Sequence, residues 1–149
     1  MKQEKLTLYT KWLLDFMYYA GIVVTVTLPV SVKIYGRINS YFAEYYVHLV
    51  ILFAVSGILA VLILRELRKM FRTVLKDDCF VEENVMSLRR MGNYSFLISL
   101  VTAGRLIIYV TPAVMIVILV FVIAGLFSKV LSGVFERAIA YKLENDLTI

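Results

Sequence analysis

The chain has 149 residues, of which 61% are apolar, and its net charge at pH 7 is +5. Its mean hydropathy of +0.83 excludes a water-soluble domain, because a single small core at this length could not bury so much apolar surface. The composition therefore predicts an integral membrane protein, with the lipid bilayer as its solvent.

Windows of about 20 apolar residues predict the membrane spans in chain order. The first two are expected at residues 12–34 and 45–64. Pro29 is expected to kink the first span, because proline lacks the N–H group that would continue the helix. Thr25, four residues earlier, is expected to bond to the backbone group that the proline frees.

The apolar stretch at residues 94–127 contains one charge, Arg105, and is too long for a single crossing. Pro112 predicts a turn within it, because proline also restricts the residue before it. The third and fourth spans are therefore expected at 92–110 and 113–135.

The distribution of lysine and arginine predicts the orientation of these spans. Basic residues gather in the loop at 65–91 and near both ends of the chain, whereas the two other loops carry few or none. By the positive-inside bias, the N-terminus, this loop and the tail at 136–149 are expected in the cytoplasm. The positive charge is then a topology signal, and no direct binding of nucleic acid is predicted.

Four spans joined by short loops predict an all-α, polytopic four-helix bundle. Small residues recur every fourth position on the third and fourth spans, which allows backbones to approach closely in lipid. Packing of these two spans within one chain is favoured over a homodimer seam, and a homo-oligomer stays open as the alternative. The small residues are Ser95, Ser99, Ala103, Ala124, Ser128 and Ser132.

The cytoplasmic loop predicts two amphipathic helices. The first continues the second span and places Glu66 with the basic residues on a polar face toward lipid headgroups, with an apolar stripe opposite. The second is expected to be capped by Asp77 or Asp78 and to lead to Gly92, which marks a bend or a close backbone approach. The two apolar stripes are Leu67, Met70, Phe71, Val74 and Leu75, then Val81, Val85 and Leu88.

Two stretches of the sequence resemble a bacterial family, domain of unknown function 2975. They are Phe80 with Glu83-Asn84-Val85 and residues 88–92, and the C-terminal residues 143–149. The family often has Gly-Pro before the phenylalanine, where this chain has Asp78-Cys79. The resemblance implies a small four-span protein of the bacterial cell membrane, often encoded beside a small helix-turn-helix regulator, with no known chemistry.

The cytoplasmic face offers a candidate docking surface. Glu144 and Asp146 follow the fourth span, so the acidic tail is expected to close onto the basic loop. This contact is either a plain assembly contact or a docking surface for a cytoplasmic helix-turn-helix regulator, since single exposed ion pairs are weak. The basic candidates are Arg68, Lys69, Arg72, Arg89 and Arg90.

Arg105 lies about 20 Å along the third span from Gly92, in the outer half of the bilayer, where an unpaired charge is unfavourable. One hypothesis pairs it with Glu44, with His48 as a hydrogen-bonded interface residue. The other makes Arg105 and His48 part of an outward pocket for an anionic amphipath. Haem is one such ligand, with His48 as its axial metal ligand. Tyrosines complete this candidate ligand site: Tyr41, Tyr45 and Tyr109.

No catalytic motif occurs in the sequence, and the single Cys79 and His48 are expected at opposite membrane faces, so no enzyme is predicted. The favoured function is a sensor or regulatory partner that binds a ligand or a protein. The alternative is sequestration of haem or another anionic amphipath. A small-molecule transporter subunit ranks third, because Asp15 and Glu44 lie at span ends and not at the midplane.

Overall fold

The computed structural model describes residues 2–108 and 110–147, which form an all-helical fold without strands. Helix α5 begins within the segment predicted as the second loop helix and continues without interruption through the predicted third span. Helix α6 likewise continues through the predicted tail. The helices are α1 (Lys2–Val26), α2 (Leu28–Gly36), α3 (Ser40–Glu44), α4 (Tyr46–Leu75), α5 (Glu82–Ile108) and α6 (Pro112–Leu147).

By length and composition, α4 and α6 are able to cross a membrane. The pair α1 and α2 is bent by 61° and makes a third span if it is counted as one broken helix. The described chain therefore has two helices able to span a membrane, and up to three, which indicates a helical membrane protein; the predicted four spans are not confirmed.

The predicted kink is present, at the break between α1 and α2. Pro29 lies in the first turn of α2, where its missing N–H is not needed. The predicted role of Thr25 is wrong: its hydroxyl donates to the carbonyl of Gly21 at 2.7 Å, one turn earlier. Beyond the break, the Tyr46 hydroxyl donates to the Pro29 carbonyl at 3.0 Å, which ties α2 to the start of α4.

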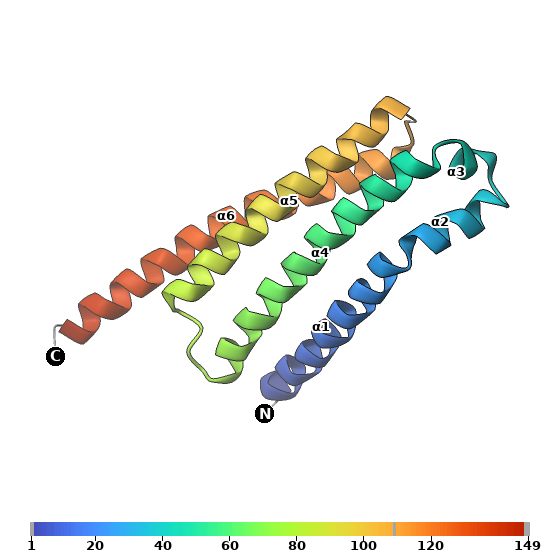
Figure 1. Cartoon of the computed structure of the whole chain (residues 1–149). Helices are drawn as coiled ribbons and strands as arrows, with labels where there is room; N and C mark the ends of the chain where they lie inside the picture. The colour runs from blue at the N-terminus through green and yellow to red at the C-terminus, as the bar shows by residue number, and fades with distance from the viewer. Residues whose placement is uncertain (1, 109, 148–149) are drawn as a thin grey trace.

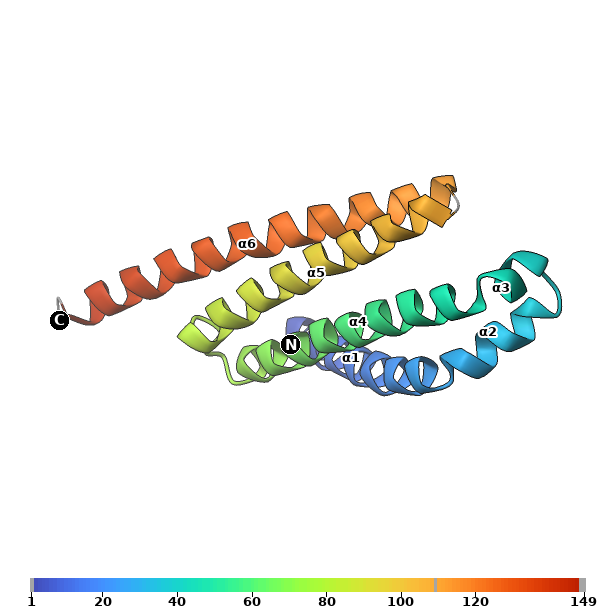
Figure 2. The same cartoon turned by 45° about the horizontal axis from the view of Figure 1, so that its top comes forward.

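The four long helices lie in the order α1, α4, α5, α6 (Figure 1). Each contacts its neighbours in this order, and in the described part of the chain α1 contacts neither α5 nor α6. The result is an open row, in place of the closed packing expected of a four-helix bundle. The two views agree that one end of the row holds both chain ends and residues 76–81, the loop end (Figure 2). The other end holds α3 and residues 110–112, the hairpin end.

The predicted small-residue contact forms within the chain, between α5 and α6. Ser95, Ser99, Ser128 and Ser132 are all buried there. The Ser99 hydroxyl contacts the Ile118 carbonyl at 3.3 Å. A Cβ at Gly92 would lie 3.2 Å from the Gly125 carbonyl, so Gly92 marks a close approach, and α5 does not bend there.

The turn between α4 and α5 differs from the predicted cap. Asp77 has a φ of 57° and ends α4, with backbone bonds from Asp77 to Val74 and from Asp78 to Thr73. This pattern is a Schellman motif, in which glycine usually occupies the left-handed position. The two aspartates therefore close α4, and α5 begins at Glu82.

Candidate functional site

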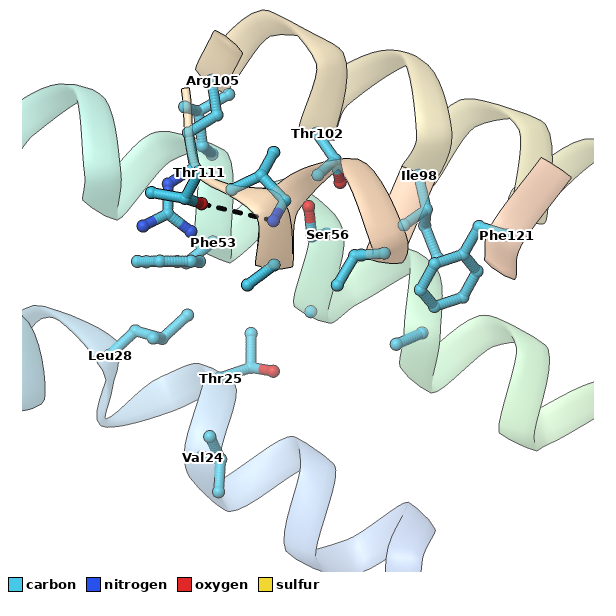
Figure 3. A pocket seen from close by; sticks show the side chains of 16 residues that line it. Val24, Thr25, Leu28, Phe53, Ser56, Ile98, Thr102, Arg105, Thr111 and Phe121 are labelled. Atoms are coloured by element: carbon cyan, nitrogen blue, oxygen red, sulfur yellow. Dashed lines mark hydrogen bonds between the residues drawn. The ribbon is translucent and has the colours of Figure 1, made fainter. Parts of the chain in front are cut away.

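A cavity of about 490 Å³ lies between α1 and α6 and is floored by α4 and α5. It exists because the row is open: among the described residues α1 contacts α4 but not α6, so the space between α1 and α6 is left unfilled over the two middle helices. Most of its wall is apolar (Figure 3). Its lining residues are Val24, Thr25, Leu28, Leu52, Phe53, Ser56, Gly57, Ala60, Ile98, Thr102, Arg105, Thr111, Ala113, Val114, Val117 and Phe121.

Arg105 supplies the one charged side chain among these lining residues. Its guanidinium carbon lies 5.3 Å from the centre of the Phe53 ring, a cation–π contact between α5 and α4 (Figure 3). None of the ion pairs between described residues includes Arg105. The guanidinium is thus oriented by an aromatic ring and left without a carboxylate partner.

Hydroxyl groups from several helices accompany this charge. Thr25, Ser56 and Thr102 line the cavity from α1, α4 and α5. Thr111 precedes α6, and its Oγ1 accepts the backbone N–H of Val114 at 3.3 Å, an N-cap. The N-terminus of α6 therefore lies at the cavity, where its partial positive charge adds to that of Arg105.

The other predicted ligand residues do not gather around Arg105. Glu44 and His48 are exposed, and neither lines the cavity. The predicted Arg105–Glu44 pair does not form, since no ion pair of the described residues includes Glu44. His48 is therefore not placed to serve as an axial haem ligand in this cavity.

The predicted tyrosines have different outcomes. Tyr45 is half-buried just before α4 and is not among the cavity residues. The side chain of Tyr41 and the whole of Tyr109 lie outside the described residues.

At the loop end, Arg68 is part of an internal contact. Its Nε donates to Asp15 at 2.6 Å, and its guanidinium lies 4.5 Å from the centre of the Tyr18 ring. Partial burial alone would lower the pKa of Arg68, but the hydrogen bond and charge of Asp15, with Tyr19, raise this pKa above its ordinary value. Arg68 therefore fastens α1 to α4 and is not free to dock a partner.

Glu66 departs from the polar face to which the sequence assigned it. It is 4% exposed, and its Oε1 lies 3.6 Å from both Lys69 and Arg90. Its Oε2 is buried without a hydrogen-bond partner among the described residues. The carboxylate draws one cation from α4 and one from α5, so two predicted docking residues serve this internal cluster.

The C-terminal part of α6 does contact the loop, but not through Glu144 or Asp146: one ion pair has the predicted sign with a different carboxylate, and the other has the reverse sign. Lys142 binds Asp78 at 3.2 Å, and Glu136 binds Arg89 at 2.9 Å. Glu144 and Asp146 are exposed and absent from the ion pairs of the described residues.

Arg72 is also exposed, with no ion pair among those residues.

The Phe80 and Phe135 rings meet edge to face with their centres 5.1 Å apart. A hollow of about 870 Å³ opens beside them. It is lined by Phe80, Ala138, Tyr141, Lys142, Glu144 and Asn145.

Sequence reasoning found Arg105 but missed the residues that surround it. Phe53 gives no separate signal, because one aromatic residue in an apolar span is ordinary. The hydroxyls of Ser56 and Thr102 are a weak signal, since polar side chains in a span usually face other helices. Which helices face one another could not be read from their spacing.

A family model described as "Protein of unknown function (DUF2975)" matches residues 31–149. No curated protein and no solved structure matches the chain.

Proposed function

The chain belongs to the DUF2975 family of proteins of unknown function, and from this premise we propose a membrane sensor that binds an anionic amphipath between α1 and α6. The single observation that carries the proposal is the placement of Arg105, which has no carboxylate partner among the described residues, in the wall of an apolar cavity. An unpaired charge at membrane depth is unfavourable and is typically retained for function.

The proposal includes four crossings of the bacterial cell membrane. Support comes from α5, which connects to α4 at the loop end and to α6 at the hairpin end and packs between them. Its 27 residues extend about 40 Å, enough for the hydrocarbon core of a bilayer. The proposed orientation places the loop end in the cytoplasm, because basic residues gather there.

The chemistry of the cavity favours an acyl chain or similar apolar body that carries one negative group. The apolar wall would hold the body, and Arg105, the hydroxyls of Ser56 and Thr102, and the α6 N-terminus would hold the anionic group. A lone imidazole outside the wall gives haem no specific support, so haem sequestration is not carried forward.

In the proposed mechanism, the ligand stabilises one position of α1 relative to α6, and the loop end reports that position to a cytoplasmic regulator. Arg68 supports this route, because it joins α1 to the cytoplasmic part of α4 through Asp15. Arg72 and Glu144 are exposed at the same end and are the proposed contacts for that partner.

The test uses the purified protein in neutral lipid nanodiscs and cis-parinaric acid, a fluorescent fatty acid, as the probe. We expect Arg105→Gln to weaken probe binding at least about 10-fold, because a hydrogen bond to a charged group contributes about 1.5–3 kcal/mol. Arg137→Gln, which removes an exposed charge near the other end of α6, should bind like the unmodified protein.

Two further readouts separate binding from signalling. The unfolding temperature of Arg105→Gln should be equal or higher, which would exclude misfolding as the cause of lost binding. Cross-linking in cells should capture the same cytoplasmic protein with the unmodified chain and show a changed yield with Arg105→Gln. Equal probe affinity of Arg105→Gln and Arg137→Gln would refute the ligand site. A capture yield that Arg105→Gln leaves unchanged would refute the sensor.

A further inference from the structure

A second hollow, of about 460 Å³, lies at the hairpin end between α2, α3 and the start of α4. It shares no lining residue with the cavity at Arg105. Lys33 and Arg37 supply two positive charges to its wall, and aromatic side chains supply much of the rest. Its lining residues are Val32, Lys33, Gly36, Arg37, Phe42, Ala43 and Tyr46.

The two cations of this hollow lack carboxylate partners. The described ion pairs include neither Lys33 nor Arg37. Between Asp15 and Glu66 the sequence contains one acidic residue, Glu44, which is exposed and outside this wall. The hollow therefore has a net positive lining that is not neutralised by this part of the protein.

The walls of the hollow are held in position by contacts that do not involve the cations. The Tyr46 hydroxyl donates to the Pro29 carbonyl at 3.0 Å, so α4 is fixed to the first turn of α2. A Cβ at Gly36 would lie 3.4 Å from the backbone of Ala43, an ordinary van der Waals contact, so α2 and α3 pack directly against each other. The walls of the hollow are thus held together on α2, which is fastened to α4 at Pro29 and packed against α3 at Gly36.

Apolar side chains beside the cations indicate what kind of anion fits. Ile38 is 82% exposed, and Ile34 and Tyr35 are exposed on the same segment. Such side chains are unfavourable in water, but they are well placed beside acyl chains and the headgroup layer. A soluble anion would leave them in water.

We propose that Lys33 and Arg37 bind the phosphate headgroup of an anionic phospholipid. In this arrangement the phosphate lies between the two cations, and Ile34 and Ile38 contact the acyl chains below it. The site is independent of the proposed ligand at Arg105, since the two sites share no side chain.

Phosphatidylglycerol and zwitterionic phosphatidylcholine are the probes, each added to the purified full chain in neutral detergent, with bound lipid counted by native mass spectrometry. We expect phosphatidylglycerol to be retained preferentially. The double variant Lys33→Gln, Arg37→Gln should bind it roughly 30-fold more weakly, because each basic residue contributes several-fold to the affinity for an anionic lipid.

The matched control is Lys76→Gln, Arg137→Gln, which removes two exposed charges toward the loop end and should retain the lipid. The charge-preserving exchange Lys33→Arg, Arg37→Lys should also retain it and guards against a folding defect. Equal losses in the double variant and the control would overturn the site, as would loss in the charge-preserving exchange. Displacement of the lipid by millimolar inorganic phosphate would assign the site to a soluble anion and overturn the lipid.

Discussion

Two charged residues of this protein are embedded in different surroundings. Arg105 lies over a phenylalanine ring in an apolar wall, whereas Glu66 lies between two cations at the α4–α5 contact. An unpaired charge lowers stability and is typical of a functional position, while a charge with two partners is typical of a structural one. The two residues are therefore expected to respond to neutralisation in opposite directions.

Glu66→Gln is expected to lower the free energy of unfolding by about 1–2 kcal/mol, because Lys69 and Arg90 would lose their shared counter-charge. Thermal unfolding of the purified protein in detergent measures this change. The control is Glu144→Gln, an exposed position that should have no effect. An unfolding temperature as high as that of the control would show that the cluster does not stabilise the α4–α5 contact.

These residues also show how far the sequence could predict the candidate site. Arg105 stood out because it is the sole charge in a long apolar stretch. This signal can be read without knowing which residues lie near it. Glu66 occurs within a basic run, where helical periodicity could not distinguish a solvated face from a face covered by α5. Asp15 was predicted to lie at the inner membrane boundary, but its contact with Arg68 joins residues 53 positions apart, beyond the reach of local patterns.

At the scale of the elements, the two prolines predicted the helix breaks correctly, but the aspartate cap was assigned to the wrong helix. Pro29 lies in the first turn after the break, Pro112 begins α6, and the serine line packs α5 on α6. The order of contacts between helices was not predictable, because the open row and the closed bundle bury the same kinds of residues. The family match covers 31–149, so the whole of α1 lies outside it.

Among the long helices of the described chain, α1 is attached only to α4, which makes this attachment testable. Asp15→Asn should weaken the bond to Arg68 by about 1–2 kcal/mol, since both side chains are only partly buried. Hydrogen exchange measured by mass spectrometry should then be faster in α1 and unchanged in α5 and α6.

Glu4→Gln, at an exposed position on the same helix, provides the comparison for that measurement. If both variants leave the exchange of α1 unchanged, the polar contact is not what holds the helix. Gly57 would then be the next candidate, because a Cβ there would lie 2.7 Å from the Thr25 hydroxyl oxygen.

For the whole molecule, the proposed four crossings place the hairpin end outside the cell and the loop end inside. Cys79 at the loop end is the single native cysteine and serves as a reporter. A membrane-impermeant maleimide should label it only after the cells are permeabilised. In a Cys79→Ser background, Ser40→Cys and Val110→Cys should both react in intact cells, because both positions are exposed at the hairpin end.

Val110→Cys addresses α5 in particular, since residue 110 reaches the outside only if α5 crosses the membrane. Labelling of Cys79 in intact cells would reverse the proposed orientation. Labelling of residue 110 only after permeabilisation would show that α5 does not cross the membrane and would reduce the proposed crossings to three.

The open row also determines how the space beside Arg105 can change its size. Among the long helices of the described chain, α1 contacts only α4, so a change in the angle between α1 and α4 would alter the distance from α1 to α6 without separating α5 from α6. Widening the space between α1 and α6 would therefore not require any helix pair to come apart. It would require only a change in the angle between α1 and α4. Under the proposed function, such a change of angle would let the same wall accept apolar bodies of different width.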